Sequence, residues 1–424
     1  MDFLKKFDIY YVITLIFILL SAGASFLSSS NIAWFIFLLF MCIYAIAKKK
    51  IMVKDLRIIG VFSLIYLAFV FIRDFGINGL ETEFFYSDVN FLFKFIYTTY
   101  IYYLLVREKV SSYLIKVVFH LTILSFFFYS LQLIGFGDDI FRFSKSLNLR
   151  PEIDFPDYTN FLFFTYIRGQ HEYRNAGFAW EPGAFGCFLS IVLMLNFFLN
   201  KFTFDRKSII FIIAIITTLS TTDYLALLVL VFCAYRYRVS KLNIWVILLL
   251  LISALVVIYV PFLGDKISDT YQADMDDLNR LKSLEVFYKH TKTQIPLNRF
   301  SSMVFLYNSF GFELILGVSN KYDIILSEVF NINISNGLFD FMARFGLVGL
   351  IYLIYGYTKF CLANVLKLEL LIYCIVVILM LGFGEPILAV PAILIFMFLS
   401  ESTQVNTDGI LKTKKRYAKP KLYI

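Results

Sequence analysis

Charged residues are scarce in this chain, and their scarcity excludes a soluble protein. Only 17% of the 424 residues are Asp, Glu, Lys or Arg, whereas 60% are hydrophobic and the mean hydropathy is +0.76. A soluble fold of this length could not remove so much apolar surface from water, and long apolar segments are typical of membrane-spanning helices. The composition therefore predicts an all-α polytopic membrane protein.

Cysteine is also rare, and the motifs of several large enzyme classes are missing. The five cysteines lie in apolar runs or in a short loop between them and lack metal-ligand spacing, so we expect neither a disulfide framework nor a zinc site. The sequence contains no glycine-rich phosphate loop, no HExxH motif and no nucleophile-elbow serine. The remaining candidates for chemistry are arginines and carboxylates.

Twelve apolar runs approach the length of a membrane span, which is about 20 residues for a helix. We expect the shorter runs to be re-entrant or to start among the lipid headgroups. The first run is either an uncleaved helix, the interpretation that we favour, or a secretory signal with a cleavage site near Ala24. The runs are Ile9–Leu27, Ile32–Ala47, Ile58–Ile72, Val89–Val106, Tyr113–Ile134, Gly183–Leu199, Ser208–Leu219, Tyr224–Tyr235, Ile244–Val260, Gly337–Tyr357, Leu368–Leu381 and Pro386–Ser400.

The distribution of positive charge predicts the orientation of these runs. When the amino end is placed in the cytoplasm and the runs alternate, most of the 39 basic residues fall on short inner segments. Both termini are then cytoplasmic. Residues 1–400 form a single membrane domain, 401–424 form a basic tail, and two long loops, at about 135–179 and 261–336, lie outside. The net charge of +8 is thus an orientation signal and a contact for anionic lipids, and it does not indicate nucleic-acid binding.

The segment 174–182, with the sequence RNAGFAWEP, lies where the first external loop meets the apolar run that begins at Gly183. Pro182 suits the first position of a helix, which places Glu181 at the helix cap, where a carboxylate satisfies free N–H groups. In the alternative interpretation, Glu181 faces a cavity at the outer leaflet as a general base or acceptor-binding carboxylate. Arg174 would then offer its guanidinium to phosphate.

Other charged residues of the external loops are weaker candidates. In the first loop, Arg168 and His171 approach the membrane beside Arg174, although a solvated surface explains most charges there. In the second loop, Arg299 precedes an amphipathic stretch, 300–316, that we expect to rest on the membrane surface. An acidic run at 274–277 is a weak match to a metal site. The second loop also contains Arg280 and His290.

Four further residues carry charge near the ends of predicted helices. Asp340 and Arg344 are spaced i, i+4 and share one helix face, so they form either a structural salt bridge or part of a site. Asp223 and Glu385 each lie at an outer helix break, and we interpret both as turn or cap residues.

This arrangement resembles the O-antigen polymerase/ligase superfamily, which includes the Wzy polymerases and the O-antigen ligases. Segment 174–182 resembles the family's Arg…Gly…Glu-Pro segment at the start of a helix. Arg299, followed by Gly317 and Val318, resembles its second arginine before a glycine turn. Segment 335–349 resembles its His-Asn…Gly-Leu-x-Gly segment, but Ser335 stands where ligases usually carry histidine, which favours a polymerase. Residues 221–223, Thr-Thr-Asp, stand where a Ser-Arg pair is often found.

The resemblance implies a GT-C-like fold of about twelve transmembrane helices and an inverting, metal-independent glycosyltransferase without a cofactor. The donor would be a growing glycan on undecaprenyl diphosphate and the acceptor a lipid-linked repeat unit, joined on the outer side of the bacterial inner membrane. Arg174 and Arg299 would bind the departing diphosphate, and Glu181, or else Asp340, would be catalytic. Weaker contributions to the same site are expected from Arg168, Arg280, His171, His290, Asn336 and Arg344.

The expected partners are the lipid-linked oligosaccharide, membrane lipids, a chain-length regulator and a flippase, and no nucleic acid. The product would be O-antigen of lipopolysaccharide, capsule or exopolysaccharide. An O-antigen ligase is the closest alternative. A lipid-linked oligosaccharide flippase or another transporter is a second alternative, disfavoured because such carriers often have internal repeats and short loops. A membrane acyltransferase is a third.

Overall fold

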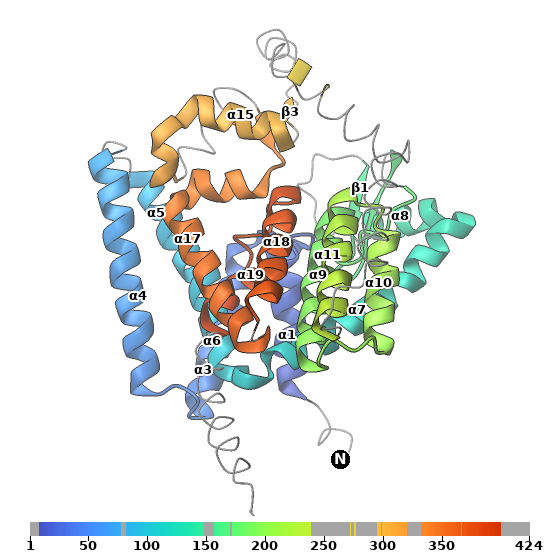
Figure 1. The fold of residues 1–424 in the computed structure, drawn as a ribbon, viewed down its shortest axis with the longest axis horizontal. Coiled ribbons are helices and arrows are strands. Elements are labelled where there is room, and N and C mark those ends of the chain that lie inside the picture. Colours follow the sequence, from blue (N-terminus) through green and yellow to red (C-terminus); the bar gives the residue numbers. More distant parts are fainter. Residues whose placement is uncertain are drawn as a thin grey trace, which may run out of the picture.

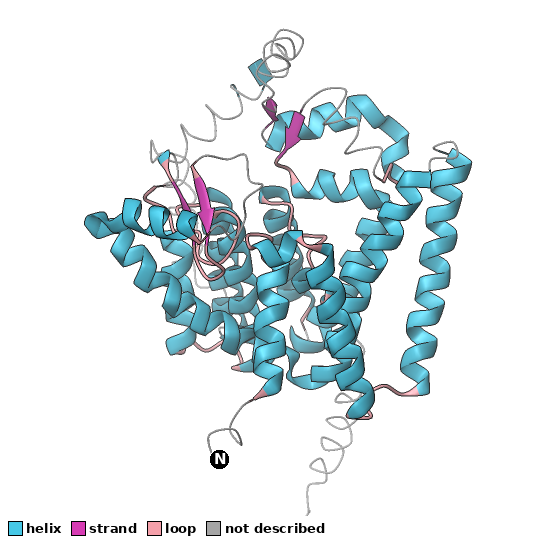
Figure 2. Cartoon of the chain, turned by 180° about the vertical axis from the view of Figure 1, so that it is seen from behind, coloured by secondary structure: helices cyan, strands magenta, loops and turns pink. Residues whose placement is uncertain are grey.

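The chain folds as a bundle of helices that carries two small two-stranded sheets at one end (Figures 1 and 2). The computed structural model describes residues 8–77, 82–147, 157–169, 172–238, 272, 275–276, 295–297, 299–319, 332–365 and 367–399. The predicted run Ile244–Val260 and the tail 401–424 lie outside the described residues.

The helices and strands follow one another in this order: α1 (Ile9–Ser21), α2 (Phe26–Ser29), α3 (Asn31–Ala47), α4 (Val53–Phe71), η2 (Ile72–Ile77), α5 (Thr82–Phe91), η3 (Leu92–Tyr97), α6 (Thr98–Val106), η4 (Arg107–Lys109), α7 (Val110–Leu131), η5 (Gln132–Phe136), α8 (Gly137–Ser146), β1 (Tyr158–Asn160), β2 (Thr165–Ile167), α9 (Pro182–Leu199), α10 (Arg206–Thr217), α11 (Thr221–Arg238), β3 (Ile295–Leu297), α15 (Arg299–Phe310), η7 (Gly311–Ile315), β4 (Ile332–Ile334), α17 (Gly337–Val365), α18 (Leu368–Gly384) and α19 (Pro391–Leu394).

Several of the helices are long and apolar enough to cross a membrane. Among the described residues, four segments meet this condition by length and composition: Val53–Gly76, Phe85–Ser146, Pro182–Leu199 and Gly337–Val365. The long segment 85–146 is bent at Arg107, whose φ is 50°, so α6 and α7 are separate as predicted. Helices α1, α3 and α18 are apolar but shorter. The protein is therefore an all-α membrane protein.

Some of the predicted runs take a different form. The first run, Ile9–Leu27, yields a helix that ends at Ser21, before a turn at Gly23 with φ of +70°. The run Pro386–Ser400 was expected to span the membrane, but α19, the one helix with assigned bounds in it, is short and buried. Prolines at 386 and 391 interrupt backbone hydrogen bonding there. Helix α17 is broken at Gly346, whose φ is +74°, where the helix lies against the backbone of Leu316.

Helix α9 is the centre of the bundle. It packs against α7, α10 and α11 (Figure 1), and 89% of its apolar window is buried, compared with 11% for the segment that contains α4. A helix that is apolar on all sides is stable when other helices enclose it. Pro182 occupies the first turn of α9, so the segment that ends at Glu181 meets the helix at one end of the bundle.

The two predicted external loops are partly folded. In the first, β1 and β2 pair antiparallel and pack on α8 around a small apolar cluster that includes Phe141, Phe164 and Tyr166. In the second, β3 and β4 pair in parallel, with Leu297 opposite Ile334. This parallel pairing brings the start of α15 beside the start of α17.

Candidate functional site

The first candidate arginine is tied to the carboxyl end of α10. Arg174 Nε donates a hydrogen bond to the carbonyl of Thr218 at 2.8 Å. The next residue, Asn175, donates its backbone N–H to the Thr217 carbonyl at 3.0 Å and its side-chain amide to the Thr217 hydroxyl at 3.1 Å. Carbonyls at the carboxyl end of a helix attract a cation, so α10 fixes where the Arg174 guanidinium lies.

Glu181 stands at the cap position of α9, as predicted, but its side chain does not cap the helix. Its backbone is extended, and its carboxylate makes no cap hydrogen bond. The Trp180 indole N–H donates instead to Glu181 Oε1 at 2.9 Å, and the carboxyl of Glu385 is a hydrogen-bonding neighbour. The carboxylate is therefore directed sideways, toward the end of α18.

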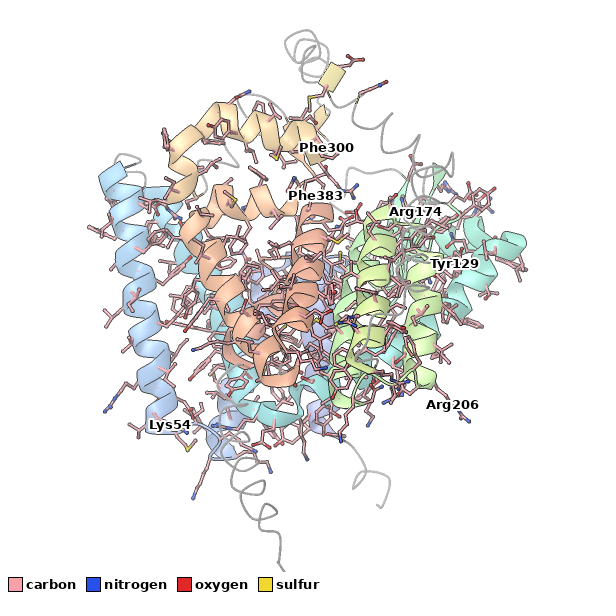
Figure 3. The ribbon with its side chains drawn as sticks, in the orientation of Figure 1. Lys54, Tyr129, Arg174, Arg206, Phe300 and Phe383 are labelled. Atoms are coloured by element: carbon pink, nitrogen blue, oxygen red, sulfur yellow. The ribbon has the colours of Figure 1, made fainter. Side chains whose placement is uncertain are left out.

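The second candidate arginine comes from the other external loop and reaches the same place. Arg299 Nε donates to the carbonyl of Gly384 at 3.0 Å, and its Nη2 lies 3.5 Å from Glu385 Oε1. The side-chain amide of Asn336 donates to the Arg299 carbonyl at 3.0 Å, which links the start of α15 to the start of α17. In Figure 3 the neighbouring Phe300 lies beside Phe383, and their ring centroids are 5.5 Å apart.

Glu385 lies between Glu181 and Arg299 and contacts both side chains. It follows α18 directly and is only 6% exposed. Burial, together with the nearby charge of Glu181, raises the pKa of the Glu385 carboxyl well above its ordinary value. A methyl group on Gly183, in the first turn of α9, would overlap Glu385 Oε1, so only glycine allows the carboxyl to lie so close to that helix.

Asp223 is the most deeply buried carboxylate near these two arginines. It is fully buried in the first turn of α11, and Cys187 Sγ lies 3.6 Å from its Oδ1. A methyl group on Gly186 would overlap this carboxylate, and Oδ2 has no hydrogen-bond partner among the described residues. The charges of Glu181, Glu385 and Asp223 all act on Arg174, and burial lowers the pKa of its guanidinium despite them.

We define the α9 cluster as Arg174, Glu181, Asp223, Arg299 and Glu385. Its two arginines come from segments far apart in the sequence, and its carboxylates come from the ends of α9, α11 and α18. In Figure 3 the labelled Arg174, Phe300 and Phe383 lie at one end of the bundle, and Lys54 and Arg206 lie at the opposite end. Guanidinium groups at the edge of an apolar bundle are suited to binding an anion.

The structure places the other predicted site residues as follows. Arg168 pairs with Asp138 at 2.7 Å and covers the ring of Phe141, so its contacts lie within the first loop. Asp340 and Arg344 form the predicted i, i+4 ion pair at 3.2 Å. Asp340 is not among the charges that act most strongly on Arg174 or Glu385. The predicted residues Arg280, His171 and His290 lie outside the described residues.

Two members of the α9 cluster make a contact that the sequence did not predict. Glu385 is the C-cap of α18 and Asp223 lies in the first turn of α11, as interpreted from the sequence, and their carboxylates also contact α9 from those two helices. The sequence signal for this contact was the pair Gly183 and Gly186. Because these glycines lie three residues apart at the start of a predicted helix, side chains from other segments can approach one face of that helix closely. Within the described ranges, no group of three or more metal-ligating side chains occurs.

Comparison of the chain with family models, curated proteins and solved structures finds no match.

Proposed function

We propose that this protein is a polysaccharide polymerase of the Wzy type, a GT-C-like membrane glycosyltransferase. It would transfer a growing glycan from undecaprenyl diphosphate to a lipid-linked repeat unit on the outer face of a bacterial inner membrane. The observation that carries the proposal is the convergence of Arg174 and Arg299, from two separate loops, on the carboxylates at the amino end of α9.

The arginines have the first task in this reaction. The acceptor hydroxyl attacks the anomeric carbon of the donor, and the bond from that carbon to the diphosphate oxygen breaks. Negative charge then accumulates on the departing lipid diphosphate. Guanidinium groups already held in place by backbone carbonyls stabilise that charge without having to reorganise. Arg174 and Arg299 are each held in this way, through Nε.

A carboxylate has the second task, because the acceptor hydroxyl must lose its proton. Glu181 is the proposed base. The Trp180 indole N–H orients its Oε1. Its neighbour Glu385, whose pKa is raised by burial and by the charge of Glu181, lies within hydrogen-bonding reach of it. The proton from the acceptor then goes to this pair, and the diphosphate leaves as an anion.

The test is the surface glycan of a deletion strain that expresses variants of the protein. Loss of a polymerase leaves glycan capped by one repeat unit, loss of a ligase leaves no glycan on the core, and loss of a flippase traps the lipid-linked unit inside. We expect Arg174→Ala and Arg299→Ala, at undiminished protein level, to give the single-repeat pattern.

The matched control is Arg206→Ala. Arg206 is an exposed arginine at the opposite end of the bundle, so its loss leaves the α9 cluster unchanged (Figure 3). Full chain ladders in both cluster variants would refute the roles assigned to the arginines. The ligase or the flippase pattern would refute the polymerase itself.

A further inference from the structure

A long apolar groove runs between α4 and α17, away from the α9 cluster. Its volume is about 600 Å³, within the range of roughly 300–1,000 Å³ typical of small-molecule sites. The walls come from α4, from Phe91 at the end of α5 and Ile96 near the end of η3, from α17, and from the end of α19 and the segment after it. Members of the lining include Val61, Phe62, Ile65, Phe345, Val348 and Tyr352.

Helix α4 is attached to the rest of the bundle near both ends of the groove. Near its amino end, Asp55 accepts a hydrogen bond from Arg107 at 3.0 Å. Directly after its carboxyl end, Arg73 donates to the carbonyl of Arg344 at 2.8 Å and pairs with Asp74 at 2.9 Å. Between these two attachments the groove runs along α4 and α17, and the rings of Phe62 and Tyr352 lie 6.0 Å apart between centroids across it.

The charge along the groove is concentrated at one end. Arg57 is the one charged residue in the lining within the described part of the chain, and Lys54 lies one turn before it on the same helix. Both side chains are exposed. From Arg57 to Phe69 the lining follows α4 for roughly 18 Å at 1.5 Å per residue. That is a little more than half of the roughly 30 Å hydrocarbon thickness of a bilayer, which is the depth of one leaflet.

We propose that this groove binds one anionic phospholipid from the leaflet at the amino end of α4. One acyl chain lies along the apolar walls, and the lipid phosphate contacts Arg57 and Lys54. Basic side chains at a helix end commonly reach the headgroup level and attract anionic lipid. The bound lipid would fill the groove between α4 and α17.

The charges favour a phospholipid over the polyprenyl chain of the proposed substrate. A lipid diphosphate held by Arg174 has its headgroup at the opposite end of the bundle from Lys54 (Figure 3). A polyprenyl chain in the groove would therefore bring no phosphate to Arg57. The groove is a site independent of the α9 cluster, and it can be tested without any polymerase assay.

The test measures lipid bound to the purified full-length protein in mild detergent by native mass spectrometry, with added phosphatidylglycerol or phosphatidylcholine. We expect phosphatidylglycerol to bind roughly tenfold more tightly, since two basic side chains face its charged headgroup. The double variant Lys54→Gln/Arg57→Gln should bind both lipids equally. Val61→Trp and Val348→Trp, which fill the groove from opposite walls, should each lose bound lipid.

Leu64→Trp is the matched control, because Leu64 is exposed on α4 but does not line the groove. It should bind lipid as the unchanged protein does. Equal binding of the two lipids by the unchanged protein would overturn the proposal. So would wild-type binding by both tryptophan variants, or displacement of phosphatidylglycerol by an equal concentration of undecaprenyl phosphate. None of these outcomes depends on the function of the α9 cluster.

Discussion

Two groups of buried charged residues in this protein hold their arginines in different ways. In the first, which we call the α4 anchor (Arg73, Asp74 and Asp88), the arginine is 1% exposed and pairs with both carboxylates. In the α9 cluster, the side chain of Arg299 is 35% exposed and stands 3.5 Å from its carboxylate. The anchor arginine is enclosed by protein, whereas the cluster arginine reaches the surface.

The difference in exposure leads us to assign a structural role to the α4 anchor and a functional role to the α9 cluster. In the α4 anchor one arginine pairs with two buried carboxylates, and removing that cation leaves uncompensated charge in the interior. The α9 cluster brings carboxylates and arginines from separate segments to one end of the bundle, where the proposed lipid diphosphate would approach them. Ionisable residues at membrane depth are functional candidates by default, and their exposure decides which of the two groups fits that description.

The largest expected effect is on stability, at the α4 anchor. Arg73→Met leaves Asp74 and Asp88 buried without their cation, which should cost about 3–5 kcal/mol of the free energy of unfolding. Thermal unfolding of the purified protein in detergent measures this, with the exposed Arg206→Met as control. If Arg73→Met melted like the unchanged protein, the anchor would have no structural role.

The next effect is on activity, at the α9 cluster. Arg299→Lys keeps the charge but loses the planar fork and the Nε hydrogen bond to Gly384. We expect polymerisation to slow by about 100-fold, comparable to the loss of one transition-state donor, with the melting temperature unchanged. Arg206→Lys is the control. A variant that lost stability in place of activity would make Arg299 another anchor.

A smaller effect is expected where α9 meets Glu385. Gly183→Ala places a methyl group against the Glu385 carboxyl and should cost about 1–3 kcal/mol through overpacking. Activity should fall as well, because the carboxyl is displaced. Gly60→Ala is the matched control, since nothing lies within 4 Å of a methyl group there. Equal behaviour of the two variants would contradict the close packing of the site.

The pH dependence of stability gives a weaker but diagnostic effect. Because the folded protein raises the pKa of Glu385, the folded state binds more protons than the unfolded state above the ordinary carboxyl value of 4.5. Stability is therefore lost as the pH rises from 4.5 toward the raised pKa. Glu385→Gln should melt at a higher temperature than the unchanged protein at neutral pH, and the gap should narrow toward pH 4.5. If the difference in melting temperature widened on acidification, the raised pKa of Glu385 would be contradicted.

The smallest effect is expected in the first external loop. Arg168 pairs with Asp138 at an exposed position, so Arg168→Gln should change the free energy of unfolding by less than about 1 kcal/mol. Polymerisation should also stay near the wild-type level. A loss like that of Arg299→Lys would restore Arg168 to the diphosphate site predicted for it from the sequence.

Local patterns predicted much of the fold. Proline at position 182 marked the start of α9. The polar residues 220–223 predicted a break between α10 and α11, and the structure places that break slightly earlier, between Thr217 and Thr221. The pairing of Asp340 with Arg344 followed from their spacing. The break of α17 at Gly346 was not predicted, because it depends on where Leu316 packs. Such contacts join segments that the sequence pattern treats as independent.

The residues of the candidate site also differ in whether the sequence predicted them. Arg174, Glu181 and Arg299 were identified because each stands beside the start of a predicted helix. The contacts of Glu385 and Asp223 with α9 were not predicted, because they depend on how α11 packs against α9 and how α18 packs against α11. The α4 anchor was missed for the same reason. A charged residue next to an apolar run needs a partner of opposite charge, and the fold determines which residue becomes that partner.

The most direct measurement is incubation of the purified protein with synthetic undecaprenyl-diphosphate-linked repeat units, followed by separation of the products by length. We predict a ladder of polymer from the unchanged protein and single repeat units from Arg174→Ala and Arg299→Ala. Ladders of equal length from both folded variants would contradict the account.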